Sequence, residues 1–315
     1  MSSLTRSECA EFLRRHDGYV ILIHRRPDGD TVGSAAVLCR GLRAMGKTAH
    51  IIGNSEVTAR YLPLLSGLTK AWPEAGDTLV SVDVASEKML PDAFRVLAGE
   101  ITLRIDHHGS ADSFTAFELV DSGSASCGEI IFDLLTTLGV KLDKAMAEAL
   151  YTAVSTDTGC FRYANTTAHS LRTAAACAEA GGDLFSINQV LFDTNSFRKL
   201  KIQSWITEHT EFLAGGRIAV CALPKAVETE IGADEDDLDG ISGFPRSIEG
   251  VKIAALLREI PGGAVKASLR AVPGYDAAAI CAQFGGGGHK GAAGCTLKMS
   301  LKDAAEAIKA AMPEI

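Results

Sequence analysis

Three short apolar runs in this chain each end directly in acidic or histidine side chains. The runs are residues 20–24, 78–82 and 101–105, and the polar side chains at or after their ends include His24, Asp28, Asp30, Asp83 and Asp106. Helical patterns lie between the runs and no hairpin turn joins them, which is typical of parallel strands. Because the carboxyl ends of parallel strands lie at one edge of a sheet, we expect these side chains to converge there.

The first part of the chain therefore predicts an α/β domain with a doubly wound, mainly parallel sheet. A further strand is expected at residues 49–52, and the expected helices are 31–45, 126–138, 143–154 and 167–180. Residues 197–213 have the apolar spacing of an amphipathic helix that links two domains. Strands at 217–222, 251–258 and 264–271 and a helix at 301–312 then predict a second, smaller α+β domain. We expect domains at 1–190 and 215–315, with the linker helix within 191–214.

The composition is that of an ordinary globular protein, with 47% hydrophobic and 22% charged residues. The chain has no apolar run of membrane-spanning length and no apolar secretory signal, so we expect a cytoplasmic protein without a membrane partner. The net charge of −8 argues against capture of long duplex nucleic acid, which needs a basic stripe. A small phosphorylated substrate held by a few local cations remains compatible with this charge.

The acidic and histidine side chains form a set with the chemistry of a metal site. Six potential ligands come from four chain segments and include no thiolate: His24, Asp28, Asp30, Asp83, His107 and Asp157. Such a set suits Mn²⁺ or Mg²⁺, and six ligands favour two ions about 3.5–4 Å apart that share one carboxylate. Taken singly, an Asp after a strand is usually a helix cap and a lone histidine is usually packing. The ordered set favours the metal site.

The second domain contains a glycine-rich segment, Phe-Gly-Gly-Gly-Gly-His-Lys-Gly, that begins at Phe284. A glycine-rich loop allows backbone N–H groups to approach an anion, although glycine runs are more often linkers. About twenty residues earlier, Ser268 and Arg270 lie on one face of a predicted strand because side chains alternate with period two. Together with His289, these residues predict a phosphate-binding site.

The DHH phosphoesterases have ordered motifs that four stretches of this chain resemble. The stretches are His24 to Ser34, Val82-Asp83, Asp106-His107-His108 and Ser155 to Gly159, and residues 284–294 resemble the glycine-rich signature of the DHHA1 domain. The resemblance implies one ion at His24, Asp28 and Asp83 and a second at Asp30, Asp83, His107 and Asp157. It also implies that Asp106 orients the histidines and that His108 faces the substrate. The implied substrate-binding residues are Ser268, Arg270, Gly287, Gly288 and His289.

The length and layout are similar to family members that hydrolyse short oligoribonucleotides and also dephosphorylate 3′-phosphoadenosine 5′-phosphate (pAp). The resemblance implies a manganese enzyme, with Mg²⁺ as an alternative, in which a metal-bridging hydroxide attacks phosphorus in line. Its expected products are 5′-mononucleotides. We also expect Gly33 and Ser34 to open a helix N-terminus towards the bound phosphate. The oligomeric state is open, and a homodimer is compatible with the sequence.

Three other readings compete with this one. A manganese-dependent pyrophosphatase would share the first domain but should have a different C-terminal signature, rich in Lys and Arg. A RecJ-like single-strand exonuclease would share both signatures, usually with extra domains and a more basic channel. A non-catalytic sensor of small nucleotides should lack one of the metal ligands, and all six are present.

One departure from the family is visible, because the chain reads Ser110-Ala111-Asp112 where members often have Asn. This departure concerns the base pocket and not the metal centre.

Overall fold

The computed structural model describes residues 2–109 and 114–314. The chain divides into two compact units, Met1–Thr194 and Asn195–Ile315, and each is described by itself. Within the described residues, the helices are all too short or too polar to cross a membrane.

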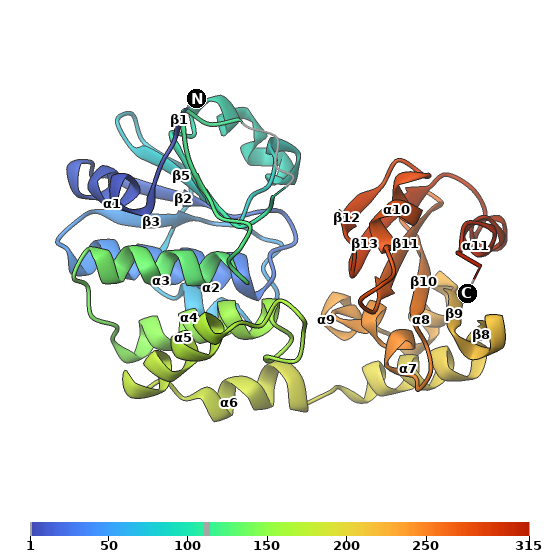
Figure 1. Cartoon of the computed structure of the whole chain (residues 1–315). Coiled ribbons are helices and arrows are strands. Elements are labelled where there is room, and N and C mark those ends of the chain that lie inside the picture. Colours follow the sequence, from blue (N-terminus) through green and yellow to red (C-terminus); the bar gives the residue numbers. More distant parts are fainter. Residues whose placement is uncertain (1, 110–113, 315) are drawn as a thin grey trace. The chain divides into compact units, whose positions relative to one another are not determined.

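The first unit is built on a seven-stranded parallel sheet (Figure 1). Its strands are β1 (Ser2–Ser3), β2 (Tyr19–Leu22), β3 (Ala49–Ile52), β4 (Thr69–Lys70), β5 (Thr78–Val82), β6 (Leu103–Asp106) and β7 (Phe117–Val120). Their order is β1-β7-β6-β5-β2-β3-β4, and every pairing is parallel. The chain runs from β2 outward to β4 and then returns to place β5 on the other side of β2. The predicted parallel α/β sheet is confirmed, and its switch point lies between β2 and β5.

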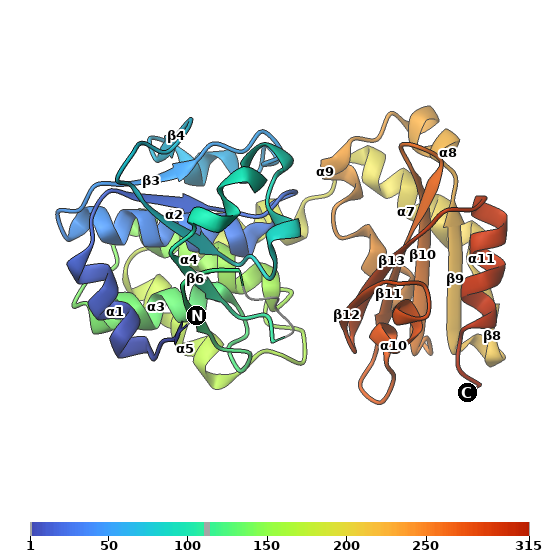
Figure 2. The same ribbon diagram turned by 90° about the horizontal axis from the view of Figure 1, so that it is seen from above.

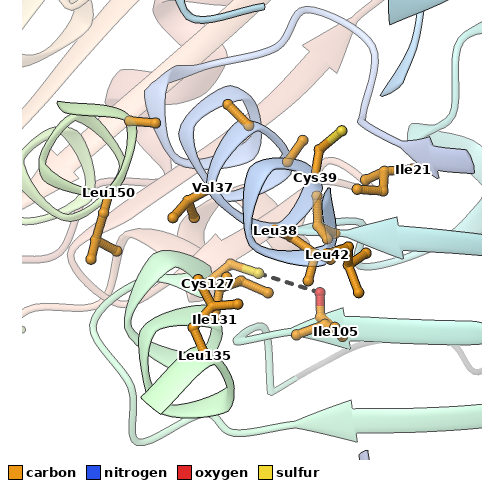
Figure 3. Packing of buried hydrophobic residues seen from close by; sticks show 14 of the residues in the cluster. Ile21, Val37, Leu38, Cys39, Leu42, Ile105, Cys127, Ile131, Leu135 and Leu150 are labelled. Carbon is orange, nitrogen blue, oxygen red and sulfur yellow. Dashed lines mark hydrogen bonds between the residues drawn. The ribbon is translucent and has the colours of Figure 1, made fainter. Parts of the chain in front are cut away.

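Helices cover one face of this sheet, and Figure 1 shows α2 and α3 between the sheet and α4 and α5. The helices are α1 (Arg6–Arg15), α2 (Gly29–Ala44), α3 (Cys127–Thr137), α4 (Lys144–Asp157), α5 (Ala168–Glu179) and α6 (Leu184–Asn188), followed by a π-helical turn at Gln189–Asp193. Apolar side chains of α2, α3 and α4 meet over the strands to form the main core (Figure 3). The other face is covered by the 3₁₀ segments Glu87–Met89 and Asp92–Glu100.

Small residues let α2, α3 and α4 approach closely beneath the edge where the strands end. A Cβ at Gly33 of α2 would lie 2.4 Å from the carbonyl oxygen of Ala149 on α4. A Cβ at Gly128 of α3 would lie 2.7 Å from the Cβ of Ala153, also on α4. Gly33 and Ser34 are buried and lie beyond the first residues of α2, which begins at Gly29, so the expectation that they open a helix N-terminus to a phosphate is wrong. Gly33 has no room for a side chain because α4 packs against it.

The second unit is a six-stranded mixed sheet with helices on both faces (Figure 2). Its strands are β8 (Glu211–Leu213), β9 (Ile218–Leu223), β10 (Ile253–Ile260), β11 (Ala264–Ala271), β12 (Gly287–His289) and β13 (Ala292–Leu297). Their order is β12-β13-β11-β10-β9-β8, with only the β9–β10 pair parallel. The helices are α7 (Phe197–His209), α8 (Lys225–Ile231), α9 (Glu235–Leu238), α10 (Ala277–Ala282) and α11 (Leu301–Ala310). One core lies under α10 and α11, and another lies under α7 and α8.

Two segments of this unit differ from their predicted form. The helix expected to run to Leu213 ends at His209, and residues 211–213 pair with β9 as strand β8. Its buried Ile202 and Ile206 pack with Cys221 and Leu223 of β9, so this helix is part of the second core. The expected glycine-rich loop is in part a strand, because residues 287–289 pair with β13. A Cβ at Gly288 would lie 2.6 Å from the carbonyl oxygen of Ala292, which explains the glycine at that position of the strand.

Candidate metal centre

The six potential ligands of the first unit come together at the carboxyl ends of β2, β5 and β6 and at the ends of α2 and α4. This is the switch point of the sheet, where open α/β folds bind their ligands. Within the described residues, three groups have ligand atoms within 4.8 Å of one another: His24, Asp28 and Asp83; Asp30, His107 and Asp157; and Asp83, His107 and His108. Asp83 and His107 each belong to two groups, so the three groups form one cluster.

Asp83 lies at the middle of the cluster. Its Oδ2 is 3.6 Å from Nε2 of His24, and its Oδ1 is 3.5 Å from Nε2 of His107. The side chain is buried, and Oδ1 has no hydrogen-bond partner among the described residues. The backbone has a φ of 57°, a left-handed conformation that costs a non-glycine residue about 1–3 kcal/mol. The carboxylate therefore presents one oxygen to each histidine from a strained position.

His24 and Asp28 form the side of the cluster next to β2. Nδ1 of His24 lies 2.7 Å from the carbonyl oxygen of Arg25, which places a proton on Nδ1 and turns Nε2 towards the carboxylates. Nε2 is 3.6 Å from Oδ1 of Asp28. Asp28 is also the N-cap of α2, since the same oxygen accepts hydrogen bonds from the backbone of Asp30 and Thr31 at 3.1 Å. The capping role and a place in the cluster thus coexist in one side chain.

Asp30, His107 and Asp157 form the other side of the cluster. Nε2 of His107 is 3.7 Å from Oδ2 of Asp30 and 3.3 Å from Oδ2 of Asp157. Asp30 is fully buried at the start of α2, and Asp157 is the last residue of α4. The close packing of α2 on α4 therefore sets the separation of these two carboxylates.

Asp106 makes hydrogen bonds with both histidines that follow it in the chain. Its Oδ1 accepts hydrogen bonds from the backbone N–H of His107 at 2.8 Å and of His108 at 3.2 Å, and it lies 2.8 Å from Nδ1 of His108. Arg104 was not singled out from the sequence. It is buried on the same strand, binds Glu118 at 2.8 Å, and places Nη1 3.8 Å from Oδ2 of Asp106. His108 has the most exposed side chain of the three histidines, at 27%.

Sequence reasoning also missed the groups that hold Asp30. Its carboxylate accepts hydrogen bonds from the backbone N–H of Cys127 at 2.7 Å and of Gly128 at 3.0 Å, which are the first residues of α3. The hydroxyl of Ser34 donates a third bond at 2.9 Å. A helix N-terminus favours an anionic carboxylate. The only sequence signal was Ser126, a good N-cap for α3, and nothing in the sequence linked that cap to Asp30.

The electrostatics of the cluster show a shortage of positive charge. Burial and the Asp83 carboxylate raise the pKa of Asp30 to about 8, and burial with the Asp30 charge raises the pKa of Asp157 well above its usual range. Burial alone would lower the pKa of His107, but Asp83, Asp30 and Asp157 raise it to about 10. The pKa of His24 is likewise raised, against its burial, by Asp28 and Asp83. Protons are held where cations would bind, and the oxygen-rich donor set with two imidazoles fits divalent Mn²⁺ or Mg²⁺.

In the second unit, the register of the sheet places the predicted substrate-binding residues in two rows. Arg270 of β11 and His289 of β12 both pair with Ala292 of the intervening β13. Ser268 and Gly287 both pair with Gly294 in the same way. Because directly paired side chains lie on one face, the small residues of β13 form a floor between Arg270 and His289, about 10 Å apart across two strand spacings. Arg270 donates to the Ser242 hydroxyl at 2.9 Å.

Comparison with known proteins identifies the family. Residues 19–154 match the DHH family, N-terminal domain, and residues 215–314 match the DHHA1 domain. A Thermus thermophilus protein named bifunctional oligoribonuclease and PAP phosphatase NrnA is 35% identical over 311 residues, which cover 97% of this chain and 92% of that protein. The chain belongs to the DHH family.

Two further relatives of this DHH family chain are more distant. A Mycoplasma genitalium protein, also named bifunctional oligoribonuclease and PAP phosphatase NrnA, is 25% identical over 94% of each chain. A solved structure of an exopolyphosphatase-related protein from Bacteroides fragilis shares the fold, with a TM-score of 0.83, 24% identity and coverage of 97% of this chain and 94% of that one. The departure from the family motif at Ser110, Ala111 and Asp112 lies outside the described residues.

Proposed function

We propose that this chain is a two-metal phosphoesterase that hydrolyses short oligoribonucleotides to 5′-mononucleotides and removes the 3′-phosphate of pAp. The observation that carries the proposal is the position of Asp83, whose two oxygens each face one histidine of a buried carboxylate cluster at the sheet switch point. The names of the T. thermophilus and M. genitalium relatives support the same substrates.

In this proposal, His24, Asp28 and Asp83 hold one divalent ion, and Asp30, Asp83, His107 and Asp157 hold the second, with Mn²⁺ the expected metal. Bound ions of this kind lower the pKa of coordinated water and offset phosphate charge. The separation of the two sides of the cluster is set by the packing of α2 on α4. Asp106 fixes the ring of His108, which is exposed enough to contact a substrate.

Substrate recognition is assigned to the second unit. Arg270 and His289 flank a floor of small residues, and Ser268, Gly287 and Gly288 are the further residues assigned to the substrate. An arginine and an imidazole on either side of such a floor suit a phosphate with its attached nucleoside. The proposed substrate-binding residues of the second unit include few cations, and the chain has a net charge of −8. Additional phosphates of a long strand therefore add little affinity.

The test is a substrate panel at fixed Mn²⁺ that contains pAp, pyrophosphate and 5′-labelled RNA of about two to 24 nucleotides. We expect kcat/KM to be highest for about two to five nucleotides, because further phosphates add little affinity. We also expect pAp to yield AMP and pyrophosphate to be a poor substrate. Asp83→Ala is the control against a contaminating nuclease. Processive degradation of the long strand, faster than that of a dinucleotide, would replace this proposal with the RecJ-like exonuclease reading. A folded wild-type protein that binds nucleotides without hydrolysis would support the sensor reading.

A further inference from the structure

An unusual turn follows Asp157 directly. Gly159, Cys160 and Phe161 have φ values of 57°, 55° and 60°, so three consecutive residues adopt the left-handed conformation. Two of them carry side chains, and each such residue costs about 1–3 kcal/mol. Backbone bonds hold the turn, including those from Cys160 N–H to the carbonyl of Ser155 at 2.6 Å and from Tyr163 N–H to the carbonyl of Thr158 at 3.0 Å. The fold therefore maintains a strained turn beside the cluster.

Side chains after the turn tie it back to the metal centre. The amide of Asn165 donates to the carbonyl of Asp157 at 3.0 Å and to that of Ala125 at 3.2 Å. Arg162 donates from Nε to the carbonyl of Gly159 at 2.6 Å, and its guanidinium lies 5.9 Å from the ring centre of Phe192. The turn and the residues it presents are thus fixed relative to Asp157.

Tyr163 is the side chain that this arrangement presents. A Cβ at Gly159 would lie 2.3 Å from Cζ of the Tyr163 ring, so the ring occupies the space that any other residue at Gly159 would fill. The side chain is nevertheless 56% exposed. Gly159 follows Asp157 by two residues, so their Cα atoms are at most about 7 Å apart. An exposed aromatic ring is therefore held against the turn that follows a proposed ligand of the reacting centre.

We propose that Tyr163 is a stacking surface for a nucleobase of the substrate. The inference rests on the proposed function, because it assumes that a nucleotide phosphate occupies the neighbouring cluster. A base is attached to that phosphate through one sugar, and its flat apolar face matches an exposed ring whose position is fixed by Gly159. Stacking on an aromatic side chain does not read base identity. The expected specificity is hence for the presence of a base and not for its sequence.

The test compares ligands with and without a base by calorimetry on the Mn²⁺-loaded protein, using AMP and ribose 5-phosphate. Tyr163→Leu keeps apolar volume over Gly159 but removes the π face, and Tyr163→Phe keeps the ring. We expect Tyr163→Leu to weaken AMP binding about tenfold, which corresponds to about 1.4 kcal/mol and lies within the range of base–aromatic stacking. Ribose 5-phosphate binding should not change, and Tyr163→Phe should bind AMP like the wild type.

The matched control is Leu171→Ala, which removes an exposed apolar side chain from α5 of the same unit. It should leave both affinities unchanged. Unchanged AMP binding in Tyr163→Leu, or an equal loss for AMP and ribose 5-phosphate, would overturn the stacking role and leave Tyr163 as packing over Gly159. Because the assay measures binding, it remains decisive if the protein hydrolyses no nucleotide. That result would reject the proposed function separately.

Discussion

Gly33→Ala tests whether the packing of α2 on α4 sets the geometry of the metal centre. The added Cβ would lie 2.4 Å from the carbonyl oxygen of Ala149 and 2.9 Å from the amide nitrogen of Ala153. Both atoms belong to the backbone of α4, so no side chain can rotate away. The helices must separate by about 1 Å to reach the 3.4 Å of ordinary contact. Asp30 lies in the first turn of α2, and Asp157 is the last residue of α4.

The expected effects on stability and on activity differ in size. Overpacking of this kind costs about 1–3 kcal/mol, and the higher helix propensity of Ala offsets about 1 kcal/mol of it. The net loss of about 0–2 kcal/mol corresponds to a fall in Tm of at most about 8 °C for a unit of this size. A displacement of about 1 Å between groups that act together can reduce kcat about 100-fold. Gly33→Ala should therefore fold and lose most of its activity.

The assay measures Tm without metal and Mn²⁺-dependent hydrolysis of a dinucleotide. Gly41→Ala is the matched control, because it makes the same change on the same helix. Its Cβ would meet the flexible end of the Leu135 side chain at 2.4 Å, which can move. It should keep activity within about threefold and change stability by less than about 1 kcal/mol. If Gly33→Ala retained wild-type kcat and Tm, the contact between the two helix backbones would not control the positions of Asp30 and Asp157.

Three further predictions concern charge and strain. Asp83→Gly and Asp83→Ala should both abolish hydrolysis. In urea unfolding without metal, the Gly variant should be more stable than the Ala variant by about 1 kcal/mol, because only glycine relieves the left-handed φ. Equal stabilities of the two variants would contradict the strain at this position. With the pKa of Asp30 at about 8 and of His107 at about 10, both groups bind more protons when folded. The stability of the metal-free protein should then fall as pH rises from about 4 to 10. The increase in Tm on adding Mn²⁺ should be larger at pH 8 than at pH 6, and calorimetry in two buffers should show that Mn²⁺ binding releases protons. Arg270→Ala should raise KM for pAp about tenfold, and wild-type kinetics would remove Arg270 from substrate binding.

The location of the cluster could be predicted from the sequence because it depends on topology. Each apolar run is a parallel strand, and parallel strands place the residues that follow them at one edge. His24, Asp83 and Asp106 therefore converge whatever the details of the loops. The positions of Ser268 and Arg270 on one face of β11 could also be predicted, because side chains alternate between the two faces of a strand and their neighbours on β11 are buried.

The features that could not be predicted depend on contacts between distant segments. The N–H groups that hold Asp30 belong to α3, almost a hundred residues further along the chain. Gly33 signals only a small residue, and the sequence does not say whether a ligand or a helix fills the space beside it. The glycines at 287–288 fit either a loop or a strand, and their pairing with β13 decides between them.

The arrangement around Asp30 explains how the fold tolerates a fully buried carboxylate before any cation binds. Two N–H groups at the start of α3 and the Ser34 hydroxyl satisfy the carboxylate of Asp30. Asp28 is satisfied in the same way by the start of α2. Asp83 differs, since its Oδ1 has no hydrogen-bond partner among the described residues and its backbone is strained. The N-termini of α2 and α3 thus fix Asp28 and Asp30 in place, while Asp83 keeps an unsatisfied oxygen, which is the condition that a bridging ligand requires.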